Sequence, residues 1–143
     1  HEERKQALAL AKFTTTLAQV SVPRVNLIAG AAYGTAAEVM NSKAIGADFV
    51  LAWPQASVGM MDAEQAVRIM YAEEIDADDD KMALIAEKTA EYAEGQSSAL
   101  AAAKRGYVDD IIEPDATRKR LIAAYEMLYG KKVTPVTKKH TAV

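Results

Sequence analysis

The chain has no cysteine among its 143 residues, so disulfides, thiolate metal sites and a cysteine nucleophile are all excluded. It has only two histidines, His1 and His140, which leaves almost no material for a histidine-based triad or a histidine metal site. No serine lies in a nucleophile-elbow motif. The sequence therefore predicts no metal site and gives little support to a mechanism driven by a side-chain nucleophile.

A strong charge of either sign is also missing. The formal net charge is -3 and the sequence pI is about 5.4, which gives no electrostatic argument for nucleic-acid binding. The longest uncharged apolar stretch, Val25 to Ala37, is too short to span a bilayer, so we expect no direct membrane span. No signal peptide is visible, and a cysteine-free chain fits a reducing compartment. The expected location is the cytoplasm, or the membrane surface through partner subunits.

Half of the residues are apolar (50%) and about a quarter are charged (26%), which is ordinary for a globular domain. No internal repeat and no linker divides the chain, so we expect residues 1–143 to form one domain. The sequence lacks an initiator methionine and opens directly in a helical pattern, which suggests a fragment of a longer protein.

The first half of the chain predicts a parallel sheet. Apolar residues at helical spacing predict a helix over the first twenty-odd residues, ended by Ser21–Pro23. A strand at VNLIAG, a turn containing Gly34, a helix from Ala36 to Ala44 and a strand at 49–53 follow. This strand–helix–strand order is typical of an α/β fold.

The second half is predicted to be mostly helical. Asp62 is a candidate N-cap of a helix with an apolar face. The acidic run 73–80 is interpreted as a solvated turn whose aspartates cap the next helix, because it lacks the mid-loop glycine and closing glutamate of an EF-hand cation site. We expect Gly95 to break that helix and Asp115 to cap the last one.

The most informative segment is AAYGTAAEVM, residues 31–40, where a strand ends, small residues follow and a helix begins. Such a turn directs unpaired backbone N–H groups outward, with the positive end of the helix dipole behind them. Small side chains also let a ligand oxygen reach the backbone, as in an oxyanion hole. Tight packing of a helix on a strand selects alanine and glycine too, and the residue pattern alone favours that interpretation.

Several longer motifs occur in order along nearly the whole chain: VPRVNLI, AYG with EVMNSKAIGAD, FVLAWPQA, MMDAEQAVRIM and AAKRGYVDDIIEPDATR. In these motifs the sequence resembles the C-terminal domain of biotin-dependent acyl-CoA carboxyltransferases. That family includes subunits of propionyl-CoA carboxylase, methylmalonyl-CoA carboxyltransferase and the sodium-pumping acyl-CoA decarboxylases. The resemblance implies a crotonase-like α/β fold, a twisted sheet core ringed by helices.

The resemblance also implies an active site made by several partners. The acyl-CoA would be held mainly by an N-terminal carboxyltransferase domain that is missing from this chain. Biotin would arrive on a separate carboxyl carrier and bind mainly to the C-terminal domain of a partner subunit in a homo-oligomer. Carboxybiotin is already activated, so its collapse needs polarisation, positioning and water exclusion rather than a protein nucleophile.

The resemblance assigns the oxyanion donors to the backbone N–H groups of Thr35 and Ala36, in a turn that begins at Gly34. It makes Glu38 a candidate for acyl-CoA choice, although a first-turn glutamate is also favoured by the helix dipole alone. Candidate biotin-pocket residues, each of which could instead be a packing residue, are Tyr33, Ala37, Trp53 and Met60.

One departure from the family pattern falls inside the turn. The family usually has Gly-Gly-Ala-Tyr where this chain has Gly34-Thr35-Ala36-Ala37. If the second glycine is needed for a positive φ, Thr35 alters the oxyanion hole, because a β-branched residue resists that conformation. If the second glycine is needed only because it leaves space for the ligand, the larger side chain of Thr35 narrows the biotin pocket. Two alternative functions stay open: a non-catalytic assembly module of the same fold, and another crotonase-superfamily enzyme acting on CoA thioesters.

Overall fold

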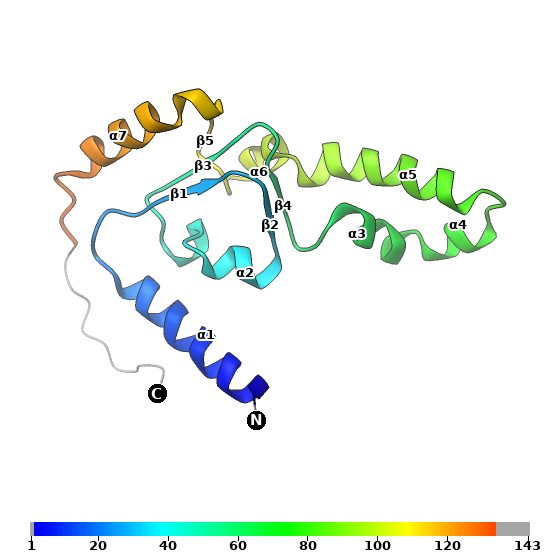
Figure 1. The fold of residues 1–143 in the computed structure, drawn as a ribbon, viewed down its shortest axis with the longest axis horizontal. Helices are drawn as coiled ribbons and strands as arrows, with labels where there is room; N and C mark the ends of the chain where they lie inside the picture. The colour runs from blue at the N-terminus through cyan, green and yellow to red at the C-terminus, as the bar shows by residue number, and fades with distance from the viewer. Residues whose placement is uncertain (1, 134–143) are drawn as a thin grey trace.

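The computed structural model describes residues 2–133, so His1 and His140 lie outside the described residues. Three parallel strands form the first sheet, in the order β1 (Val25–Ile28), β3 (Phe49–Ala52), β5 (Asp110–Ile111). Val25 pairs with Phe49, and Leu51 pairs with Asp110. The predicted parallel α/β arrangement is therefore confirmed (Figure 1).

A second, two-stranded sheet extends the first. The chain runs from β1 through Ala29–Gly30 into β2 (Ala31–Tyr33), and from β3 into β4 (Ser57–Gly59). β2 and β4 are parallel, with Tyr33 opposite Gly59 at their shared end. The sequence did not predict these two strands, which are only three residues long each.

Alanine allows the helices to approach the first sheet closely. The buried cluster contains Val50 and Val108, and its other members are Ala47, Ala52, Ala56, Ala99 and Ala102. Two of these alanines belong to α6 (Ala99–Lys104), which packs against β4 and β5. Val50 on the central strand is 1% exposed and contributes about 1.5–3 kcal/mol by burial.

Helices α3 (Ala63–Met70), α4 (Ala72–Ala77) and α5 (Lys81–Tyr92) form a projecting hairpin, which we call the arm (Figure 1). The arm has its own small core, made of Val67, Ile75 and Ile85, separate from the cluster under the sheet. The predicted cap is confirmed, since the Asp62 carboxylate accepts a hydrogen bond from the Glu64 N–H at 3.1 Å.

Two predicted helix boundaries are wrong. The helix expected to reach Ala44 ends earlier: α2 spans Gly34–Val39, Asn41 takes a positive φ of 62°, and a 3-10 turn, η1, covers Lys43–Ile45. Gly95 does not break a helix, because it lies inside a π-helical turn, η2 (Ala93–Ser97), that continues α5.

Two acidic segments also differ from the prediction. Much of the acidic run is helical, as α4, although Asp80 does cap α5 by accepting from the Ala83 N–H at 3.1 Å. Asp115 is not a cap: it lies in the 3-10 turn η3 (Pro114–Ala116), and no side chain caps α7 (Thr117–Leu128). Proline at the first position of η3 fixes the entry into α7 instead.

The first helix, α1 (Glu2–Gln19), has the predicted bounds but not a buried face. Leu10 and Phe13, two of the apolar residues whose helical spacing predicted this helix, are 40% and 43% exposed. No helix in the described residues is long and apolar enough to cross a membrane.

A polar network joins three parts of the chain that are distant in sequence: the residue before β1, the residue before β3 and the segment after α7. The Asp48 carboxylate accepts from the Arg24 N–H at 2.7 Å and pairs with the Lys131 ammonium at 2.8 Å. Lys131 also donates to the Val22 carbonyl at 3.3 Å. This Arg24–Asp48–Lys131 network fastens the segment after α7 to the sheet.

The network makes stability depend on pH. Burial raises the pKa of Asp48, but hydrogen bonds from Lys131 and from the Arg24 N–H, with both positive charges, outweigh it and leave the pKa below its usual value of 3.8. A carboxyl whose pKa is lower in the folded protein adds stability above its unfolded pKa and loses it as the pH falls through the folded pKa.

Asp48→Asn is therefore expected to lower the free energy of unfolding by about 1–2 kcal/mol at neutral pH. Urea titrations from pH 7 down to pH 2 should show this difference shrinking below the usual pKa of 3.8. Asp76→Asn is the matched control, since Asp76 makes a 3.2 Å pair with Lys81 but its side chain is 82% exposed. A constant difference over the whole pH range would contradict the prediction.

Candidate functional site

The turn predicted to bind an oxygen lies where β2 ends and α2 begins. Tyr33 is extended, with φ −120°, and Gly34 takes φ +58°, a left-handed conformation that favours glycine. A Cβ placed on Gly34 would lie 3.1 Å from the carbonyl oxygen of Met60. The pairing of β2 with β4 therefore brings Tyr33, Gly34 and Met60 together.

The two candidate donors lie in the first turn of α2. No side chain caps this helix, and Thr35 and Ala36 are both exposed. The first N–H groups of an α-helix have no partner within it. Apart from glycines, only Asn41 has a positive φ in the described part of the chain. Position 35 thus has a backbone conformation that a β-branched residue can adopt.

Three more of the candidate residues lie near this turn. Met60 is 75% exposed beside Gly34, while Ala37 is half-buried within α2. Glu38 is exposed one turn into α2, and its backbone carbonyl accepts from the Ser42 hydroxyl at 2.6 Å. The structure therefore places Glu38 on the helix that begins at the turn.

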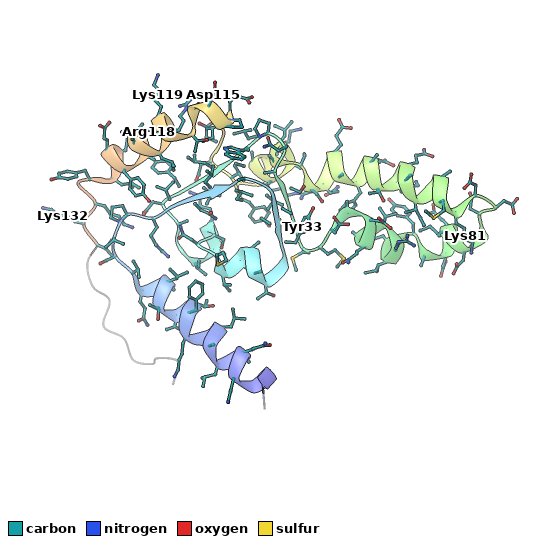
Figure 2. All side chains as sticks on the ribbon, in the orientation of Figure 1. Tyr33, Lys81, Asp115, Arg118, Lys119 and Lys132 are labelled. Atoms are coloured by element: carbon teal, nitrogen blue, oxygen red, sulfur yellow. The ribbon has the colours of Figure 1, made fainter. Side chains whose placement is uncertain are left out.

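Trp53 lies elsewhere. It follows β3 at the opposite end of the second sheet from Tyr33, and its indole Nε1 donates to the Thr117 hydroxyl on α7 at 2.9 Å. Together with Leu121 and Tyr125 it lines an open groove along α7. Figure 2 shows Tyr33 well away from Asp115 and Arg118, which line the same groove. The structure does not bring Trp53 to the Gly34 turn.

Residues that hold α2 in place were missed by sequence reasoning. The Asn26 amide on β1 donates to the Met40 carbonyl at 3.3 Å, at the end of α2. Arg24 is buried and donates to carbonyls of η1 and the following glycine. The only local signal was a charged residue placed directly before an apolar strand.

No group of three or more histidine, aspartate or glutamate side chains that could hold a metal ion occurs between residues 2 and 133. What the turn offers chemically is a pair of backbone N–H groups at the positive end of a short helix, beside an exposed apolar side chain.

Comparison with known proteins gives the family. Residues 7–143 match the model of the carboxyl transferase domain. The chain is 47% identical over 130 residues to a putative propionyl-CoA carboxylase beta chain of Bacillus subtilis (strain 168), covering 91% of this chain and 26% of that one. It is 41% identical over 130 residues to the methylmalonyl-CoA decarboxylase subunit alpha of Propionigenium modestum, covering 91% and 25%.

A solved structure shows the same fold. The transcarboxylase 12S structure with methylmalonyl-coenzyme A and methylmalonic acid bound, described as a hexamer assembly, superposes with a TM-score of 0.90. Its sequence is 37% identical, and the match covers 97% of this chain and 27% of that one. The crotonase-like α/β fold is therefore confirmed, and the chain spans about a quarter of the length of these relatives. This chain belongs to the carboxyl transferase family.

Proposed function

We propose that this chain is the C-terminal, biotin-side half of an acyl-CoA carboxyltransferase that moves CO₂ between biotin and a short acyl-CoA. The observation that carries the proposal is the uncapped first turn of α2, where Gly34 takes a positive φ and the following residues are small and exposed. It occurs in a chain whose family members include carboxylase, decarboxylase and transcarboxylase subunits.

The residues at the turn fit the ureido ring of biotin. The N–H groups of Thr35 and Ala36 point out of the first turn of α2, so they would bind and polarise the ureido carbonyl. The position of Met60 suits an apolar wall beside that ring, and Tyr33 directly precedes the turn. Bound biotin supplies the activated carboxyl group, and the chain contributes orientation, charge stabilisation and exclusion of water.

The other half of the site would come from a missing N-terminal domain, which holds the acyl-CoA, and from a partner subunit. The transcarboxylase 12S protein binds methylmalonyl-CoA and forms a hexamer, which supports a CoA thioester and a homo-oligomer here. Large apolar side chains are exposed on α1, the arm and α7, among them Phe13, Ile69 and Met127. Such surfaces are expected to be covered in an assembly.

We expect the 143-residue chain alone to show negligible turnover, because the effective molarity between biotin and thioester is lost without the other half. The direct test reconstitutes the full-length protein and measures carboxyl exchange between biotin and malonyl-type CoA esters. Exchange that depends on biotin supports the proposal. A folded, assembled protein without exchange contradicts it and favours the assembly module.

Thr35→Gly tests the role of the turn more finely. Because position 35 has no positive φ, the substitution should leave the exchange rate within about threefold or raise it modestly, since it removes the side chain and keeps the backbone N–H. Thr35→Val is the matched control, because it keeps the bulk and removes only the hydroxyl group. A loss of exchange with both Thr35→Gly and Thr35→Val would show that the hydroxyl group, which both substitutions remove, acts at this position, and not only the backbone N–H.

A further inference from the structure

Arg24, directly before β1, has an unusual environment. It is 9% exposed, and only one other polar residue, Ser97, is buried in the part of the chain that the structure describes. Its guanidinium donates to three backbone carbonyls, those of Leu17 at 2.7 Å, Ile45 at 2.9 Å and Gly46 at 2.6 Å. A buried cation is costly unless it is well hydrogen-bonded, so these contacts define one position for the group.

The three carbonyls belong to the surroundings of α2. Leu17 lies in the last turn of α1, and Ile45 and Gly46 lie in the segment that leads from α2 into β3. Both α1 and η1 pack against α2. Gly46 has φ +90°, and a Cβ there would lie 2.7 Å from the Arg24 Nη2. The guanidinium therefore occupies the space that any side chain at position 46 would need.

Two further hydrogen bonds reach the C-terminal end of α2, one from β1 and one from the residue before η1. Asn26 donates to the Met40 carbonyl at 3.3 Å, and Ser42 donates to the Glu38 carbonyl at 2.6 Å. The C-terminal end of α2 is thus held from β1 and from η1, while its N-terminal end carries the Gly34 turn. A short helix fixed at one end transmits a displacement of that end to the other.

We propose that Arg24 is a positioning residue for the turn at Gly34. It does not touch the turn, and it acts by fixing α1, η1 and thereby α2 relative to the sheet. The inference rests on the proposed function, since it assigns a catalytic consequence to this geometry. Arginine is required because a planar fork can reach carbonyls on several sides, whereas a lysine ammonium is a compact point charge.

The test uses Arg24→Lys in the full-length protein. A misplacement of about 1 Å can cost up to 100-fold in rate, so we expect kcat for carboxyl exchange to fall about 10-fold with KM for acyl-CoA unchanged. Deuterium uptake should rise in peptides covering residues 35–46. Arg68→Lys is the matched control, because Arg68 on the arm makes only an exposed pair with Glu64 at 2.7 Å. It should change neither quantity.

Gly46→Ala perturbs the same contact from the other side and guards against misfolding of the first variant. The double variant should lose less kcat than the product of the two single losses, because both disturb one interaction. Unchanged deuterium uptake in Arg24→Lys, or losses that multiply, would overturn the inference. A wild-type protein without exchange would overturn the proposed function, while the deuterium comparison would still decide whether Arg24 holds α2.

Discussion

Replacing Gly34 with valine is expected to lower biotin-dependent carboxyl exchange in the full-length protein by about 100-fold or more, the effect of losing an oxyanion donor. Gly34 has φ +58°, and a Cβ there would lie 3.1 Å from the Met60 carbonyl oxygen. A β-branched residue resists this conformation at a cost of about 1–3 kcal/mol. The turn would therefore shift, and the N–H groups of Thr35 and Ala36 would shift with it.

The control for this variant is Gly106→Val. Gly106 also has a positive φ, +82°, but no atom lies within 4 Å of a Cβ built there. It follows α6, away from the turn. Both variants should lose stability in thermal melts because both strain a positive φ, but only Gly34→Val should lose exchange. Equal loss of exchange in the two variants would mean that backbone strain, and not the turn, limits activity.

Val67→Asp is expected to unfold the arm while the sheet domain stays folded. Val67 is fully buried in the arm's own core with Ile75 and Ile85. An uncompensated buried carboxylate costs about 3–5 kcal/mol, more than so small a cluster can supply. Hydrogen exchange should become rapid across α3, α4 and α5, while amides of β1 and β3 keep their protection.

Ile69→Asp is the matched control for the arm, because it lies on the same helix and is 67% exposed. It should change the helical circular dichroism signal little. Global unfolding by Val67→Asp would show that the arm and the sheet form a single cooperative unit, contrary to their separate clusters.

The sequence predicts those parts of the fold whose causes are local. The β1–α2–β3 order follows from apolar runs and turn residues, and the Asp62 cap follows from its position before a periodic segment. The strands β2 and β4 were missed because three residues have no usable period. The early end of α2 is followed by Asn41 at a positive φ; asparagine tolerates this conformation, so this local signal for a helix end was overlooked.

The site was less predictable than the fold. Residue pattern alone favoured simple packing at the turn, and only the family resemblance pointed to Thr35 and Ala36. Trp53 lies at the opposite end of the second sheet from the turn, where its indole donates a hydrogen bond to Thr117, 64 positions away in sequence. Arg24 was missed for a similar reason, because its acceptors at Ile45 and Gly46 become neighbours only after the sheet has formed.

The separate core of the arm has a consequence for the order of folding. The arm's contacts join α3, α4 and α5, which are adjacent in sequence, so little loop-closure entropy opposes their formation. The first sheet is complete only when β5 pairs with β3, a closure seen in the hydrogen bond from Val50 N–H to Asp109 across 59 positions. The arm should therefore gain structure early, during synthesis or refolding, while the sheet that carries the Gly34 turn waits for the last strand.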